Sequence, residues 1–145
     1  MAVIKARNYY NQIFCLTDYL VAPLLLLIRG YIAWVFIKSG LTKMNDWDST
    51  LMLFEYEYQV PLLPFELAAY MATVGEIVLP VLLIAGLLTR LSALGISVIN
   101  IVAVISLVEI AEAALMLHIF WGSLLLVNII YGAGRLSVDN YLKLK

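Results

Sequence analysis

Long apolar stretches separated by short polar segments dominate this sequence. The first begins at residue 20 and reads LVAPLLLLIRGYIAWVFIKSGLTK. A helix needs about 20 apolar residues to cross the roughly 30 Å hydrocarbon core of a bilayer, because it rises about 1.5 Å per residue. The pattern predicts four membrane-spanning helices, at about residues 20–42, 65–86, 91–108 and 114–134.

The composition supports a membrane location. Of the 145 residues, 64% are hydrophobic and only 13% are charged, whereas globular domains carry about 45–50% and 25%. A soluble fold of this length cannot bury so much apolar surface, so we expect an integral protein surrounded by lipid. The chain has no basic run interleaved with aromatic residues, and nucleic acid is therefore not an expected partner.

Four spans joined mostly by short turns predict an all-α, antiparallel four-helix transmembrane bundle. In that topology Lys43 is the one basic residue placed near an acidic connection. By the positive-inside rule, the basic side and both termini are cytoplasmic. The basic residues on that side are Lys5, Arg7, Arg90, Arg135, Lys143 and Lys145.

The remaining segments have distinct expected places. We expect 1–19 to be an interfacial N-terminal segment, 20–135 the transmembrane domain and 136–145 a cytoplasmic tail. The longest connection, 43–64, is acidic and aromatic. It is predicted to contain a short helix over 50–58, capped by Asp48 or Ser49. Whether this connection lies on the membrane surface or folds back over the bundle stays open.

Arg29, Glu76 and Asn100 are polar residues near the middle of the first, second and third predicted spans. An arginine at the centre of a span costs about 2.5–3.5 kcal/mol, so it needs a partner. Counting from the cytoplasmic ends places all three residues at a similar depth. We therefore predict an Arg29–Glu76 ion pair with Asn100 beside it. Two roles are open for this buried polar cluster: a structural pair that holds the helices together, or a ligand site. The structural role is favoured, because the two charges already satisfy each other.

His118 and Trp121 lie three residues apart, near the outer mouth of the predicted bundle. The chain has one histidine and no HxxE or ExxH pair, so no metal site and no haem held by two histidines are expected. A site using His118 and Glu112 is the weaker alternative to an interfacial His–Trp anchor. Nucleotide and flavin motifs are also absent from the sequence, and no catalytic residue can be assigned.

Several motifs together resemble the DoxX family of small four-span bacterial membrane proteins. They are Arg29-Gly30, Gly40-x-x-Lys43, Glu76, GLLTRLSAL from residue 86, FEYEYQVPLLP before the second span and HIFWG…YGAGRLSVD near the end. The resemblance implies an inner-membrane protein that acts as a subunit or accessory component of a quinone-linked redox system. It also implies redox-protein partners, a quinone as a possible cofactor, and a homo-oligomer as one option. The alternative is a non-catalytic scaffold or export accessory.

Overall fold

The structure, a computed structural model, describes the backbone of residues 2–144 and the side chains of residues 19–144. This region is helical and contains no strand, apart from one isolated bridge between Tyr58 and Leu107. The predicted all-α fold is confirmed. The helices are α1 (Ala2–Asn45), α2 (Trp47–Tyr56), α3 (Phe65–Ala85), α4 (Thr89–Ser106), α5 (Glu112–Tyr131) and α6 (Val138–Tyr141).

Four of these helices are long and apolar enough to cross a membrane: the Tyr19–Asn45 part of α1, and α3, α4 and α5. Only 11–33% of the most apolar stretch of each is buried inside the protein. Many of the other residues are large, apolar and exposed, which is unfavourable in water and favourable in lipid. The predicted four-helix membrane bundle is confirmed, and the chain is a multi-pass membrane protein.

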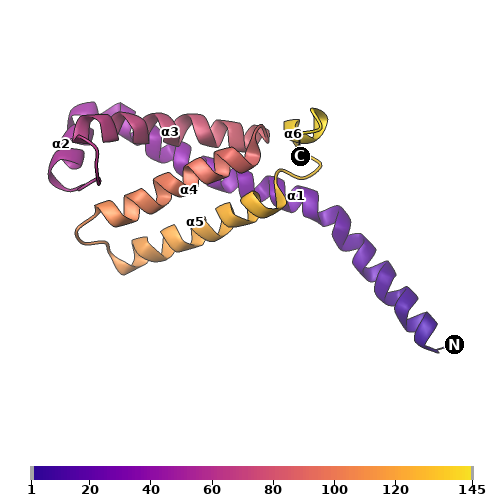
Figure 1. Cartoon of the computed structure of the whole chain (residues 1–145). Helices are drawn as coiled ribbons and strands as arrows, with labels where there is room; N and C mark the ends of the chain where they lie inside the picture. The colour runs from indigo at the N-terminus through magenta and orange to yellow at the C-terminus, as the bar shows by residue number, and fades with distance from the viewer. Residues whose placement is uncertain (1, 145) are drawn as a thin grey trace.

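Helix α1 is much longer than its neighbours. It has 44 residues, or about 66 Å at about 1.5 Å per residue. Its N-terminal half extends beyond the other helices, as Figure 1 shows. The backbone has no helix end near residue 19, where we expected an interfacial segment to give way to the first span. The side chains of that segment, Lys5 and Arg7 included, lie outside the described residues.

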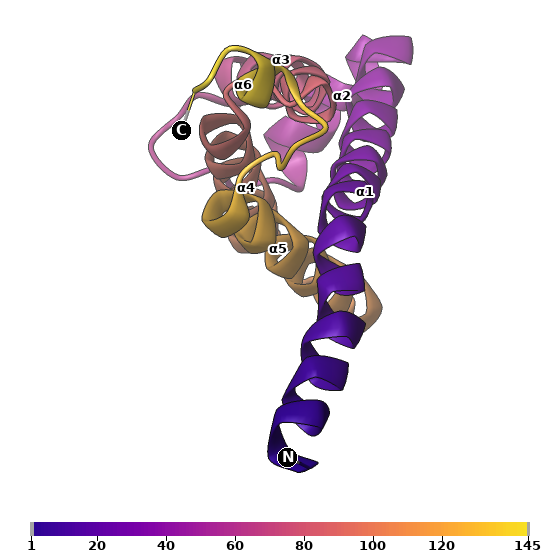
Figure 2. The ribbon, with the colours of Figure 1, turned by 90° about the vertical axis from the view of Figure 1, so that its right-hand side faces the viewer.

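The helices pack in the order expected for an antiparallel bundle. Helix α3 contacts both α1 and α4, and α4 contacts α5 (Figure 2). Gly40 allows a close approach of α1 to α3, because a Cβ added there would lie 2.8 Å from Ile77. The apolar core between the helices consists of Ile32, Phe36, Leu83, Ala93, Ile96 and Leu125.

The two ends of the chain leave the bundle at the same end. Figure 1 shows α6 beside the turn between α3 and α4, and the free half of α1 projects from that end as well. This arrangement matches a chain with an even number of spans. The cytoplasmic placement of this end stays a prediction.

Helix α2 folds back onto the opposite end of the bundle. Asp46 caps it by accepting from the Ser49 N–H at 3.0 Å and the Ser49 hydroxyl at 2.6 Å, and these bonds lower the pKa of the Asp46 carboxyl. The helix thus begins earlier than predicted, with Asp46 as its cap. Phe54 packs on Ala68 and Ala69 of α3. Helix α2 is therefore packed against the bundle, whereas Leu62 in the following turn is fully exposed.

The C-terminal segment is fastened to the turn between α3 and α4. Leu88 precedes α4 with a left-handed φ of 48° and provides no side-chain cap. The Asp139 carboxylate takes that role from 50 residues away, accepting from Leu88 N at 2.8 Å and Thr89 N at 2.9 Å. It satisfies two of the backbone N–H groups that a helix start leaves unpaired.

We expect Asp139→Ala to lower the free energy of unfolding by about 1–2 kcal/mol, because a lost helix cap typically costs that much. The C-terminal segment should also come loose, so trypsin should cut faster after Arg135. Thermal unfolding in detergent and limited proteolysis measure the two effects. Asp48→Ala is the matched control, since Asp48 is an exposed carboxylate in the first turn of α2. Equal proteolysis of the two variants would contradict the fastening role.

Candidate functional site

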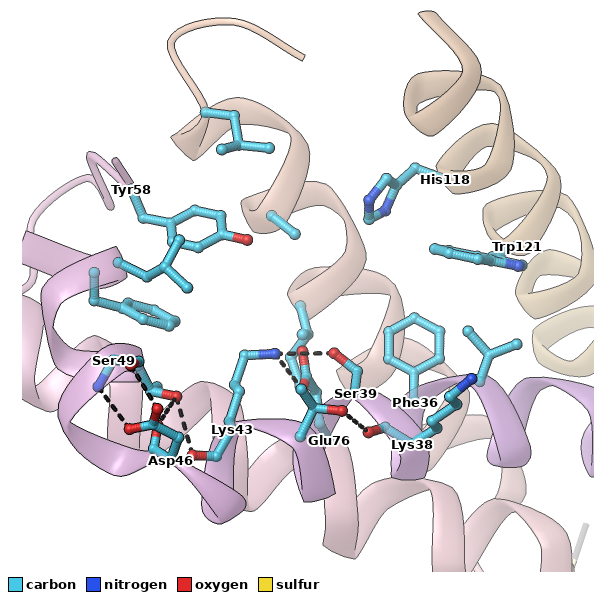
Figure 3. A pocket seen from close by; sticks show the side chains of 18 residues that line it. Phe36, Lys38, Ser39, Lys43, Asp46, Ser49, Tyr58, Glu76, His118 and Trp121 are labelled. Atoms are coloured by element: carbon cyan, nitrogen blue, oxygen red, sulfur yellow. Dashed lines mark hydrogen bonds and ion pairs between the residues drawn. The ribbon is translucent and has the colours of Figure 1, made fainter. Parts of the chain in front are cut away.

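A cavity of about 670 Å³ lies between the helices at the end that carries α2. We call it the main cavity. The five helices from α1 to α5 all contribute to its wall, and Figure 3 shows the side chains that line it. The polar and aromatic groups relevant to function are Ser39, Lys43, Tyr58, Glu76, His118 and Trp121. Its size is within the range of small-molecule sites, about 300–1,000 Å³.

An ion pair between Lys43 and Glu76 is the main polar feature of this cavity. Lys43 Nζ lies 2.6 Å from Glu76 Oε2 and 2.9 Å from Ser39 Oγ. The side chains are only 18% and 8% exposed, so little water screens the pair. An ammonium group has three N–H donors, and these two bonds use two of them. Figure 3 shows Nζ projecting into the open space, so the third donor is available there.

The predicted pairing of Arg29 with Glu76 is wrong. Lys43 holds Glu76, while Arg29 lies at the other end of the bundle. The two cations are 14 positions apart on α1, or about 21 Å along the helix axis. The depth count failed because it took residue 20 as the membrane edge, whereas α1 continues far beyond the bundle at that end.

Arg29 belongs to the contact between the bundle and the C-terminal segment. Its side chain is fully buried, and Nη2 donates to the Leu136 carbonyl. The Asp139 carboxylate is close enough to attract its charge. Nε and Nη1 are buried without a partner among the described residues. Arg29 is therefore placed to hold helix α1 to the C-terminal segment, and it does not line the main cavity.

Asn100 makes its hydrogen bonds to His118 rather than to Arg29 or Glu76. Its Nδ2 donates to the His118 carbonyl at 3.0 Å, so its Oδ1 is the atom that faces His118 Nδ1, at 2.7 Å. An amide oxygen only accepts, and Nδ1 must therefore carry the proton. In the neutral ring this leaves Nε2 as an acceptor. Asn100 thereby sets the tautomer of a residue that lines the main cavity.

His118 and Trp121 lie together at the main cavity, at the end where the sequence placed an outer mouth. Their rings meet edge to face, with centroids 5.0 Å apart. Trp121 also packs on Phe36 at 6.0 Å and donates from Nε1 to the Tyr31 hydroxyl at 3.3 Å. These contacts join α5 to α1 and fix the orientation of the indole in the cavity wall.

Tyr58 contributes a hydroxyl from the connection between α2 and α3. Gln59 N, beside it, donates to the Ser106 carbonyl at 2.8 Å, which ties this connection to the end of α4. Burial raises the pKa of Tyr58, and the Glu76 and Glu57 carboxylates raise it further. The hydroxyl therefore keeps its proton at neutral pH and remains a hydrogen-bond donor.

A second cavity, of about 440 Å³, adjoins the main one. We call it the side cavity; its walls come mainly from α3 and α4. Both cavities are lined by Lys43, Tyr58 and Glu76, so the ion pair stands at their junction. The rest of the side cavity is largely apolar and reaches the outer surface at Met71 and Val98, which are 56% and 60% exposed.

Three polar or aromatic residues of the main cavity, Ser39, Lys43 and Tyr58, were not recognised from the sequence as site residues. Lys43 was noted only as an exception to the charge asymmetry. A lone lysine at the end of an apolar helix is nevertheless a candidate partner for a carboxylate inside another span, because such a carboxylate needs a cation. Tyr58 resembled an ordinary interfacial aromatic residue. Of the predicted residues, Glu76, His118 and Trp121 line the cavity, Asn100 orients His118, and Arg29 is remote.

No group of three or more His, Cys, Asp or Glu side chains in the described part of the chain is arranged to hold a metal ion. The Lys43 ammonium also opposes cation binding beside Glu76, because it already neutralises that carboxylate. The main cavity is suited instead to a neutral or anionic group that accepts hydrogen bonds.

Comparison with known proteins agrees with the sequence motifs. An uncharacterized protein of Haemophilus influenzae is 32% identical over 126 residues, which cover 82% of this chain and 83% of the relative. No solved structure matches the chain. The family model described as DoxX matches residues 24–109. This match includes α2, α3, α4, the bundle part of α1 and the Lys43–Glu76 pair, and the chain belongs to the DoxX family.

Proposed function

We propose that this DoxX protein is a membrane component of a quinone-linked redox system, and that the quinone headgroup binds in the main cavity. The observation that supports it best is the Lys43 ammonium, which is paired with Glu76 yet has one donor left toward the open space. A quinone carbonyl oxygen needs such a donor. Tyr58 offers a second one, from a different wall of the cavity.

Reduction of a bound quinone to the hydroquinone takes up two electrons and two protons. In this proposal a partner redox protein supplies the electrons, since the chain has no flavin or nucleotide motif. The cavity contributes two proton-transfer groups, the Glu76 carboxylate and the His118 imidazole, both of which line it. Asn100 keeps the His118 ring in one tautomer, so its Nε2 is ready to exchange a proton.

Quenching of Trp121 fluorescence by a tail-less benzoquinone tests this proposal directly. The chain has three tryptophans, and changing Trp34 and Trp47 to phenylalanine leaves Trp121 as the sole reporter in the cavity wall. We expect saturable quenching that Lys43→Met weakens about tenfold or more, because a lost charged hydrogen bond costs about 1.5–3 kcal/mol. Lys143→Met, an exposed lysine at the other end of the bundle, is the control.

Organic extraction of the protein purified in mild detergent provides an independent measurement. We expect it to contain native quinone in wild-type protein and much less in Lys43→Met. A quinone-free extract, together with quenching that is linear in concentration and equal in both lysine variants, would contradict the proposal. The non-catalytic scaffold would then be the better account of the family motifs.

A further inference from the structure

We infer that the side cavity holds the apolar tail of the quinone and that the ligand enters it sideways from the bilayer, between α3 and α4. This inference rests on the proposed headgroup site and adds where the remainder of the ligand lies. It predicts that the protein binds tailed quinones more tightly than tail-less ones. This preference comes from contacts between the protein and the tail, in addition to the partition of tailed compounds into lipid.

The first argument is the continuity of the two cavities. Lys43, Tyr58 and Glu76 line both, so a headgroup bonded to Lys43 Nζ stands at the junction. A substituent that leaves the headgroup on the α3–α4 side passes directly into the side cavity. The other residues common to both cavities are apolar: Phe54, Ile99 and Ala103.

The second argument is the chemistry of the side cavity wall. Past the junction it is lined by small and aliphatic side chains with few polar groups, as an alkyl or isoprenoid chain requires. Gly75 and Gly95 lie on facing helices, and a Cβ at either would meet Ile99 or Leu79 within 2.7 Å. The helices are therefore close together at this part of the wall, and the open side of the cavity lies at its exposed residues.

The third argument is the position of that open side. Met71 of α3 and Val98 of α4 belong to the wall, and both are more than half exposed on the outer surface of the bundle. In a membrane this surface faces lipid, where a tailed quinone resides. A ligand reaching Lys43 by this route avoids water entirely, while the connection between α2 and α3 covers the end of the bundle.

Val102→Phe tests the inference, because Val102 lines the side cavity but not the main one, and a phenyl ring would fill part of the space. The assay compares the dissociation constants of a tail-less benzoquinone and its decyl analogue, both read by Trp121 quenching in nanodiscs. Phenylalanine is chosen over tryptophan so that no new fluorophore is added. Ile101→Phe is the control, since Ile101 is adjacent, 57% exposed and lines neither of the two cavities.

We expect wild-type protein and Ile101→Phe to bind the decyl compound more tightly than the tail-less one by the same ratio. That ratio should fall about tenfold in Val102→Phe, while tail-less binding stays within about twofold of wild type. An unchanged ratio overturns the inference and leaves the headgroup site standing. Failure of the tail-less compound to bind wild type overturns the proposed function instead, and the tail site with it.

If Val102→Phe also loses tail-less binding, the smaller change Ala72→Leu replaces it. Ala72 lines the side cavity from α3 and is likewise absent from the main one. A lower tail-dependent ratio in this variant supports the inference, and wild-type values for both compounds overturn it. Partition of the decyl compound into lipid is the same for every variant, so it cancels from the comparison.

Discussion

Lys43→Met is expected to lower the free energy of unfolding by about 3–5 kcal/mol, the usual loss when one partner of a buried ion pair is removed. The Glu76 carboxylate would remain 8% exposed, without its cation, in the middle of α3. Titration with SDS in mixed micelles measures the change. The double variant Lys43→Met/Glu76→Met should recover most of the loss, because replacing both partners of such a pair by apolar groups is often close to neutral.

Lys38→Met is the matched control for this prediction. Lys38 lies five residues earlier on α1, is exposed, and has Nζ 5.5 Å from the centre of the Trp34 ring. An exposed cation–π contact of this kind contributes about 0.5–1 kcal/mol, so the control should lose no more. Equal losses in the two single variants, or a double variant less stable than Lys43→Met, would show that the pair does not stabilise the bundle.

Gly86→Ala is expected to cost about 2–4 kcal/mol and to release the C-terminal segment. Gly86 has a φ of 71°, a left-handed conformation that costs other residues about 1–2 kcal/mol. A Cβ there would also collide with Arg29 Nη1 and lie 2.5 Å from Ser137 Cβ. One of these groups must move, so either the buried guanidinium or the docked segment is displaced. Thermal unfolding in detergent and trypsin cleavage after Arg135 measure the effects.

Gly30→Ala is the control, and its effect should have the opposite sign. Gly30 follows Arg29 inside α1, and a Cβ added there meets nothing within 4 Å. Alanine in a helix interior is favoured over glycine by about 1 kcal/mol, so the variant should be as stable as wild type or more stable. A Gly86→Ala protein with normal stability would mean that the turn and the C-terminal segment adjust without cost.

The sequence predicted the helices well because their signal is local. Apolar runs of membrane length identify spans whatever they pack against, and the ends of α3 and α5 fall within a few residues of the predicted positions. Helix α1 was harder, since a continuous helix from Ala2 leaves no break at the bundle edge. The polar stretch before residue 19 resembled an interface, and the sequence has no feature that shows how far the helix projects.

The identity of ion-pair partners requires more than a depth count. Arg29 and Lys43 lie on one helix, and either would have satisfied Glu76 by charge alone. The choice depends on the position of α1 along the axis of α3. The close contact of Gly40 with Glu76 and Ile77 sets this position. In this register Arg29 lies beside Gly86, where it donates to the Leu136 carbonyl and is attracted by the Asp139 carboxylate.

The sequence by itself determined that this is a four-span helical membrane protein of the DoxX type, with an internal carboxylate that needs a cation. Those properties follow from the number of apolar residues and from the cost of a charge in lipid. Only the tertiary structure showed that Lys43 is the cation that pairs with Glu76, that α2 folds back over the end of the bundle, and that Asn100 hydrogen-bonds to His118. Each of these depends on contacts between different helices, which packing selects and local composition does not encode.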